Sequence, residues 1–164
     1  MPTPPIPVAT HERRGEWARQ LRPRLLAWPT ELGSFRLVES RSVDDLERVV
    51  AGQPAPIVLL DVSDRPREAL DALERAARLA PNGLFLVLDP RSHPELDRTA
   101  RELGATLVLP GFVPPPRVAD LIARWIPLAR RRASADGWSP PLDVRPEAND
   151  PPPWADLLPA WARD

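Results

Sequence analysis

The chain has 164 residues, 43% hydrophobic and 27% charged, which is typical of a globular domain with a buried core. All 22 basic residues are arginine, no cysteine occurs and only two residues are histidine, which excludes lysine Schiff-base chemistry, disulfides and Cys/His zinc sites. Since no apolar run approaches membrane-spanning length, we expect a cytoplasmic protein without a membrane partner.

The first third of the chain predicts a strand, a helix, a second strand and a second helix. Residues 6–10 are a weak strand candidate, because prolines confine such a segment to a sheet edge or to the first residues of a strand. Residues 12–28 predict a helix that Pro23 should kink or divide. Residues 34–40 alternate partly like a strand, and Ser42 is a candidate cap for the following helix. The apolar face of the first helix is formed by Trp17, Leu21, Leu25 and Trp28.

The middle of the chain repeats this strand–helix unit. Three further strands are expected at residues 55–61, 83–89 and 105–109. The first two are continuous apolar runs, which is typical of parallel strands buried on both faces. Ser63 or Asp64 is a candidate cap for the third helix, and residues 92–104 predict a fourth helix capped by Ser92. A final helix follows the three prolines at 114–116.

Strands that alternate with helices predict an α/β protein, here a flavodoxin-like three-layer sandwich around a parallel sheet. The sheet has five strands, or four if residues 6–10 do not form one. Charge and proline divide the chain further: residues 1–133 carry a net charge of +3, and residues 134–164 carry −4. We expect a disordered segment at 1–5, the α/β domain at 6–133 and a Pro/Trp-rich tail at 134–164.

Three segments of the domain follow one another in a distinctive order. Residues 33–40 form a strand with a polar exit, residues 57–62 form an apolar strand that ends at Asp61, and residues 104–112 contain Gly-Ala-Thr-Leu-Val-Leu-Pro-Gly-Phe. Together they resemble the receiver domain of bacterial response regulators. In that family, the first of these segments is the second strand, and the second is the strand that ends in the phosphoacceptor aspartate. The third resembles the family's segment Gly-Ala-x-x-x-(apolar)-Lys-Pro-Phe. The resemblance implies a strand order of 2-1-3-4-5 and a place in signal transduction, such as a phosphorelay.

The residues that carry the family's chemistry are only partly present. The resemblance implies an acidic pair after the first strand, an aspartate after the third, Ser or Thr after the fourth and lysine after the fifth, with the acids holding Mg²⁺. Asp61 matches this pattern, whereas Glu12 is the single acid after the first strand. Asp89 stands at or beside the hydroxyl position, and Leu109 stands at the lysine. A phosphate on Asp61 therefore lacks its main cationic partner.

Several interpretations of these acids stay open. Asp61 is a candidate phosphoacceptor, or a strand-end aspartate that binds its own loop. Glu12, Asp61 and Asp89 are candidate ligands for Mg²⁺, or solvated loop acids. A small flavodoxin-like enzyme that uses Asp61 and Asp89 is a further alternative. No glycine-rich fingerprint indicates a nucleotide cofactor, and the arginines between 124 and 132 fit helix-end electrostatics better than nucleic-acid binding.

We therefore expect a degenerate, pseudo-receiver-like module that binds a protein partner, uses no cofactor, is not an enzyme and is not phosphorylated. Its oligomeric state is not predicted. The candidate interaction surface on the domain consists of Leu109, Pro110, Gly111, Phe112 and Trp125. In the tail, a helical turn would bring together Trp154, Leu157, Leu158 and Trp161. Because tryptophan is enriched at binding hot spots, we expect this part of the tail to dock on a partner or on its own domain.

Overall fold

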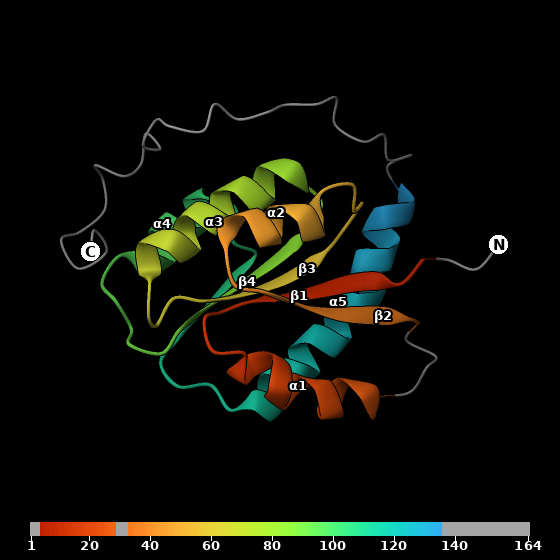
Figure 1. Ribbon diagram of the computed structural model, residues 1–164, viewed down its shortest axis with the longest axis horizontal. Coiled ribbons are helices and arrows are strands. Elements are labelled where there is room, and N and C mark those ends of the chain that lie inside the picture. Colours follow the sequence, from red (N-terminus) through yellow and green to blue (C-terminus); the bar gives the residue numbers. More distant parts are fainter. Residues whose placement is uncertain (1–3, 29–32, 136–164) are drawn as a thin grey trace.

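The computed structural model describes residues 4–28 and 33–135. Five parallel strands form one sheet in the order β2-β1-β3-β4-β5 (Figure 1). The strands are β1 (Ile6–His11), β2 (Phe35–Ser40), β3 (Ile57–Asp61), β4 (Leu84–Asp89) and β5 (Leu107–Pro110). The helices are α1 (Glu16–Leu26), α2 (Val43–Val50), α3 (Pro66–Leu79), α4 (Leu96–Glu102) and α5 (Pro115–Ala135). The five-stranded flavodoxin-like fold and its strand order are confirmed.

Two hydrophobic layers hold the sheet between the helices. Helices α2, α3 and α4 cover one face, and α1 and α5 cover the other (Figure 1). Successive side chains of a strand point to opposite faces, so Val58 and Leu60 of β3 enter the first layer while Ile57 and Leu59 enter the second. All four are completely buried. The uninterrupted apolar run of β3 follows from this burial on both faces.

The first strand lies inside the sheet, between β2 and β3, and not at an edge. Its prolines are tolerated because they come at its start. The amide of Ile6 donates to the carbonyl of Ser34 on the β2 side. Pairing with β3 begins only at Val8, which lies opposite Ile57. Pro7 therefore precedes the first residue pair on that side, where its missing N–H is not needed.

The helix starts agree with the sequence only in part. The hydroxyl of Ser42 accepts from the amide of Asp45, as expected for the cap of α2. Neither Ser63 nor Asp64 caps α3, which begins at Pro66 without a side-chain cap. The cap predicted at Ser92 is also wrong, since α4 begins only at Leu96. Pro23 and Pro127 lie inside continuous helices, so Pro23 does not divide α1.

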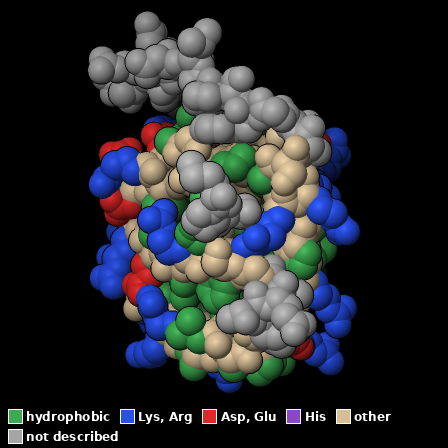
Figure 2. Space-filling view, turned by 90° about the vertical axis from the view of Figure 1, so that its right-hand side faces the viewer, with side chains coloured by type: hydrophobic (Ala, Val, Ile, Leu, Met, Phe, Trp, Pro, Cys, Tyr) green, Lys and Arg blue, Asp and Glu red, His purple; other side chains and the backbone are tan. Residues whose placement is uncertain are grey.

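The arginines of α5 contact the main chain at the side where β1 enters the sheet. Arg130 donates to the carbonyl of Ser34 at 2.8 Å, and Arg132 donates to the carbonyls of Asn82 and Gly83. Figure 2 shows this side of the molecule, with arginine side chains on both flanks and hydrophobic side chains between them. At least two of these arginines thus serve the fold. None of the described helices is long and apolar enough to cross a membrane.

A buried histidine ends β1. His11 is only 5% exposed, and its Nδ1 lies 2.9 Å from the hydroxyl oxygen of Ser40 on β2. Burial lowers the pKa of His11 below its ordinary value, and the nearby carboxylates of Glu68 and Asp45 oppose this shift only in part. The folded protein therefore takes up a proton at His11 less readily than the unfolded chain does.

This difference predicts that acid weakens the fold through His11. Because the pKa is lower in the folded state, the stabilising contribution is present above about pH 6.5 and is lost as the pH falls from there toward the folded value. Urea unfolding at pH 7.5 and 5.5 should show a smaller pH-dependent loss for His11→Gln than for the wild type. His93→Gln is the control and should keep the loss due to His11. An identical pH dependence in His11→Gln and the wild type would contradict the prediction.

Candidate functional site

The carboxyl ends of β1, β3 and β4 carry the three acids that the sequence singles out. Glu12 follows β1, Asp61 is the last residue of β3, and Asp89 is the last residue of β4. Glu12 and Asp61 line the same two small hollows, of about 100 and 130 Å³. Asp89 lines neither hollow. The fold thus brings together Glu12 and Asp61 and leaves Asp89 in a separate environment.

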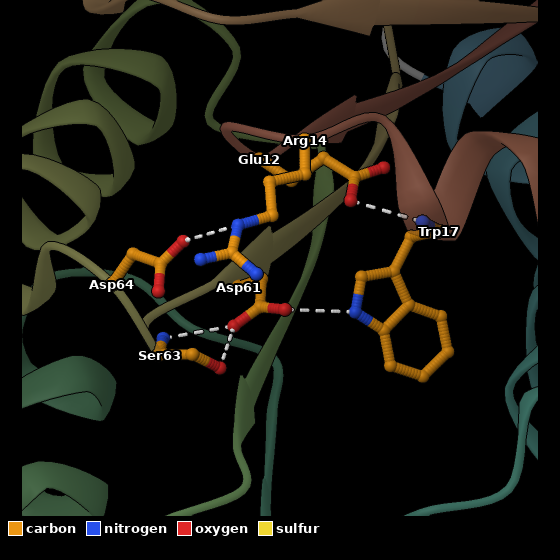
Figure 3. A network of polar contacts seen from close by, with 6 residues as sticks. All are labelled: Glu12, Arg14, Trp17, Asp61, Ser63 and Asp64. Atoms are coloured by element: carbon orange, nitrogen blue, oxygen red, sulfur yellow. Dashed lines mark hydrogen bonds and ion pairs between the residues drawn. The ribbon is translucent and has the colours of Figure 1, made fainter.

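Asp61 is held by hydrogen bonds at both carboxylate oxygens (Figure 3). Its Oδ1 accepts from the amide of Ser63 at 2.8 Å and from the hydroxyl of the same residue. Its Oδ2 accepts from the indole Nε1–H of Trp17 at 2.8 Å. The Ser63 contacts form a local turn after the strand, which explains why Ser63 is not available to cap α3.

Glu12 serves as the cap of α1, although it lies outside the helix. Its Oε2 accepts from the amide of Trp17 and its Oε1 from the amide of Ala18, each at 2.9 Å. These amides belong to the first turn of α1, where backbone donors have no partner within the helix. Gly15 makes the turn possible, since its φ of 69° is in the left-handed region that favours glycine. The helix therefore starts at Glu16 and not at Glu12.

Burial gives Glu12 an unusual titration. The residue is only 8% exposed, and its desolvation raises its pKa above the ordinary value. The hydrogen bonds from the amides of Trp17 and Ala18 oppose this rise, whereas the negative charge of Asp61 adds to it. The two acids that share the site therefore repel each other, and the chain's own donors offset the repulsion.

Asp89 pairs with His93 in the loop between β4 and α4. Its Oδ2 accepts from the amide of His93 and its Oδ1 lies opposite the ring Nδ1, both at 2.7 Å. Its carbonyl accepts from the amides of Ser92 and Gly111. These contacts hold residues 89–93 in a turn, so the helix expected from Ser92 begins four residues later, at Leu96. Asp89, at 2% exposure, also ties this loop to the segment that follows β5.

Arginines provide the positive charge around Asp61. Arg13, Arg14 and Arg65 line one or both hollows together with Glu12 and Asp61. Arg14 extends across the site toward Asp64, with its Nε 3.6 Å from a carboxylate oxygen (Figure 3). Its side chain is 69% exposed, so solvent screens this ion pair strongly. The negative charge of the two acids thus has cationic neighbours within the chain itself.

The acids do not fit the magnesium site that the resemblance implies. Such a site needs carboxylate oxygens free to face the metal and its waters. Here Glu12 is bound by α1, Asp61 by Trp17 and Ser63, and Asp89 by His93. Within residues 4–28 and 33–135, no group of three or more His, Cys, Asp or Glu side chains is arranged to hold a metal ion.

Leu109, at the position that the resemblance assigns to the family's lysine, has apolar neighbours. Leu109 of β5 lies opposite Leu88 of β4, and it packs against the layer under α1 and α5. Pro110, which follows it, lies opposite Asp89 and is exposed. No ammonium group from another position can substitute, because the chain contains no lysine.

The candidate interaction residues fall into three environments. Leu109 and Gly111 are half-buried, whereas Pro110 is exposed and Phe112 is 81% exposed. Trp125 is 9% exposed and packs in the layer under α1 and α5, so it lies beneath the surface and not on it. The tail candidates lie outside the described residues: Trp154, Leu157, Leu158 and Trp161.

The sequence did not indicate the partners of the acids. Trp17 recurs at helical spacing with apolar residues, which predicts only a core role, and it does pack against the layer under α1 and α5. Its indole N–H nevertheless reaches Asp61, which is 44 positions away in the chain. Trp17 carries an indole donor and lies five positions after Glu12, and this spacing is the one signal in the sequence that could have suggested the contact.

No protein-family model matches this sequence, and neither does any curated protein. Solved structures do match. A CheY-like response-regulator receiver domain from Methanospirillum hungatei is 12% identical, with a TM-score of 0.61, covering 78% of this chain and 98% of that one. A Burkholderia pseudomallei response regulator with a phosphorylated aspartic acid is 12% identical, with a TM-score of 0.57, covering 81% of this chain and 75% of that one.

A third similar structure is the pilus assembly protein CpaE from Caulobacter crescentus. It is 18% identical, with a TM-score of 0.54, and the match covers 73% of this chain and 98% of that one. At identities this low, the structural similarity establishes the fold and leaves the chemistry of the site open. The described part of this chain has the fold of a response-regulator receiver domain.

Proposed function

We propose that this protein is a degenerate receiver-like module, which acts in signal transduction or regulation by binding another protein and is not phosphorylated. The observation that carries the proposal is the set of contacts around the Asp61 carboxylate. Both of its oxygens accept hydrogen bonds from within the chain, and no lysine is available to pair with a phosphate on it. A site that lacks this lysine, and whose aspartate is already held by Trp17 and Ser63, is without the partner through which the family's phosphorylation switch acts.

Two further switch positions support the same function. At or beside the position of the family's Ser or Thr, Asp89 carries a carboxylate that is tied to His93. At the position of the lysine, Leu109 faces apolar neighbours. Apart from Asp61, the places that respond to phosphate in the family thus carry side chains with another role here: Glu12 caps α1, Asp89 binds His93 and Leu109 packs in a hydrophobic layer. We further propose that the protein has no enzymatic activity, since Asp61 and Asp89 share no hollow in which they could act on one substrate.

A contact surface is proposed at the segment that follows β5. Phe112 is one of two large hydrophobic side chains that the described residues leave strongly exposed, and Leu26 on α1 is the other. An exposed aromatic side chain next to an exposed proline on a short loop can insert into a partner's pocket. The loop itself is fixed, because the amide of Gly111 donates to the carbonyl of Asp89.

The second candidate function is a working phosphoacceptor receiver that uses Asp61. It is favoured by the position of Asp61, which ends β3 beside Glu12 at the carboxyl edge of the sheet. The two functions make opposite predictions about phosphorylation, so one experiment separates them.

Treatment with acetyl phosphate and Mg²⁺ is expected to leave the protein unmodified. Phosphate on Asp61 would have to displace the Trp17 and Ser63 contacts without gaining an ammonium partner. Intact-mass spectrometry should give the same unphosphorylated spectrum for the wild type and for Asp61→Asn, beside a working response regulator treated in parallel. A phospho-adduct that is present in the wild type and absent in Asp61→Asn would establish the second candidate instead.

Phe112→Ser is expected to weaken partner binding while it leaves the fold intact. Because the side chain is exposed, the free energy of unfolding should change by no more than about 0.5 kcal/mol. The matched control is Leu26→Ser, which removes the other exposed hydrophobic side chain. Quantitative affinity capture with the full chain should identify a protein that the wild type and Leu26→Ser retain and Phe112→Ser loses, and purified components should reproduce the difference. If no bound protein depends on Phe112, this surface is wrong.

A further inference from the structure

The Asp61 site is closed by a single aromatic side chain. We infer that the indole N–H of Trp17 occupies the one oxygen of Asp61 through which a divalent cation would bind, and that removal of this N–H opens the site. The inference rests on the proposed function and identifies the residue that keeps Asp61 from binding a metal. Trp17 is in this sense a blocking residue, which acts by occupying a ligand position.

The two oxygens of Asp61 are not equivalent. Oδ1 receives two hydrogen bonds from Ser63, one from the amide and one from the hydroxyl, which uses both of its acceptor positions. Oδ2 receives the indole N–H alone, at 2.8 Å. A cation would therefore have to approach Oδ2. Mg²⁺ also keeps several of its waters when it binds protein carboxylates, so it needs open space beside the carboxylate. The indole ring of Trp17 stands directly at Oδ2 (Figure 3).

Trp17 cannot move away from Asp61 without loss elsewhere. Its backbone amide donates to Oε2 of Glu12, so the residue is attached to both acids of the site at once. It belongs to the first turn of α1, and its ring packs against the layer under α1 and α5. The backbone contact, the helix and the ring packing together orient the N–H before any ligand arrives.

Arg14, at the rim of the site, does not close Oδ2 in the same way. Arg14 is 69% exposed, and its side chain points toward Asp64. In the described structure it makes no hydrogen bond or ion pair with Asp61. Solvent screens its charge, whereas the indole contact is direct. Access to Oδ2 is therefore governed by Trp17.

Trp17→Phe is the variant that isolates the N–H. Phenylalanine keeps an aromatic ring for the hydrophobic layer and keeps the backbone amide that donates to Glu12. It lacks only the indole donor and the larger ring. Trp28→Phe is the matched control, because Trp28 packs against the same layer and has no part in the Asp61 contacts. Asp61→Asn in the Trp17→Phe background tests whether any gain depends on the Asp61 carboxylate.

The probe is Mn²⁺, detected by paramagnetic broadening of backbone amide signals in the full chain, with Mg²⁺ as competitor. In Trp17→Phe, the signals of residues 61–64 should broaden in a saturable way that Mg²⁺ reverses. The apparent affinity should exceed that of the wild type and of Trp28→Phe by about tenfold or more, because a hydrogen bond to a charged acceptor no longer competes. The added Asp61→Asn change should abolish the effect.

Two results would overturn the inference: wild-type protein that binds Mn²⁺ at Asp61 as well as Trp17→Phe does, or no binding in either. The second result leaves the proposed function intact, since that function is tested by phosphorylation of the wild type. If Trp17→Phe does not fold, the indole signal of the wild type serves in its place. Asp61→Ala should shift the Trp17 indole N–H resonance upfield and speed its hydrogen exchange, and an unchanged signal would overturn the inference.

Discussion

The carboxyl ends of the parallel strands carry three acids, Glu12, Asp61 and Asp89. Two of them, Glu12 and Asp89, are buried. A carboxylate in such a place needs donors, and this chain provides them from its own helices and loops: α1 for Glu12, Trp17 and Ser63 for Asp61, and His93 for Asp89. The loops at the carboxyl ends of the strands are arranged by this need for hydrogen-bond donors. It determines where α1 and α4 begin, and it leaves Ser63 unavailable as a cap.

A site whose acids accept hydrogen bonds from the chain itself differs from a site whose acid oxygens are free to bind a ligand. In a phosphorylation switch, an incoming charge must find free donors and change the balance between two conformations. Here Trp17 and Ser63 already donate to the Asp61 carboxylate. The same contacts that close the site also fix the loops around it. In the function proposed above, this end of the sheet presents the exposed Phe112 to a partner in one arrangement.

The fold was accessible from the sequence because it follows from local patterns. The apolar runs of β3 and β4 predict strands buried on both faces, and Ser42 predicts the start of α2. The site was less accessible, because the contact that closes it joins residues that are distant in the chain. Asp61 and Trp17 are 44 positions apart, and helical spacing alone assigns the tryptophan to the core. Ser92 fails as a cap for a local reason, since the Asp89 side chain and carbonyl hold the turn that includes it.

Likeness of fold cannot decide between a working switch and a fixed module. A response regulator with a phosphorylated aspartic acid and a pilus assembly protein match this chain at similar TM-scores, 0.57 and 0.54. The chemistry of the strand ends therefore has to be argued from this chain's own side chains. In this chain Asp61 is in the place where the family's phosphoacceptor is found, yet its neighbours satisfy it as they would any structural aspartate. In the function proposed above, the decisive feature is that Trp17 and Ser63 occupy the oxygens of this strand-end aspartate.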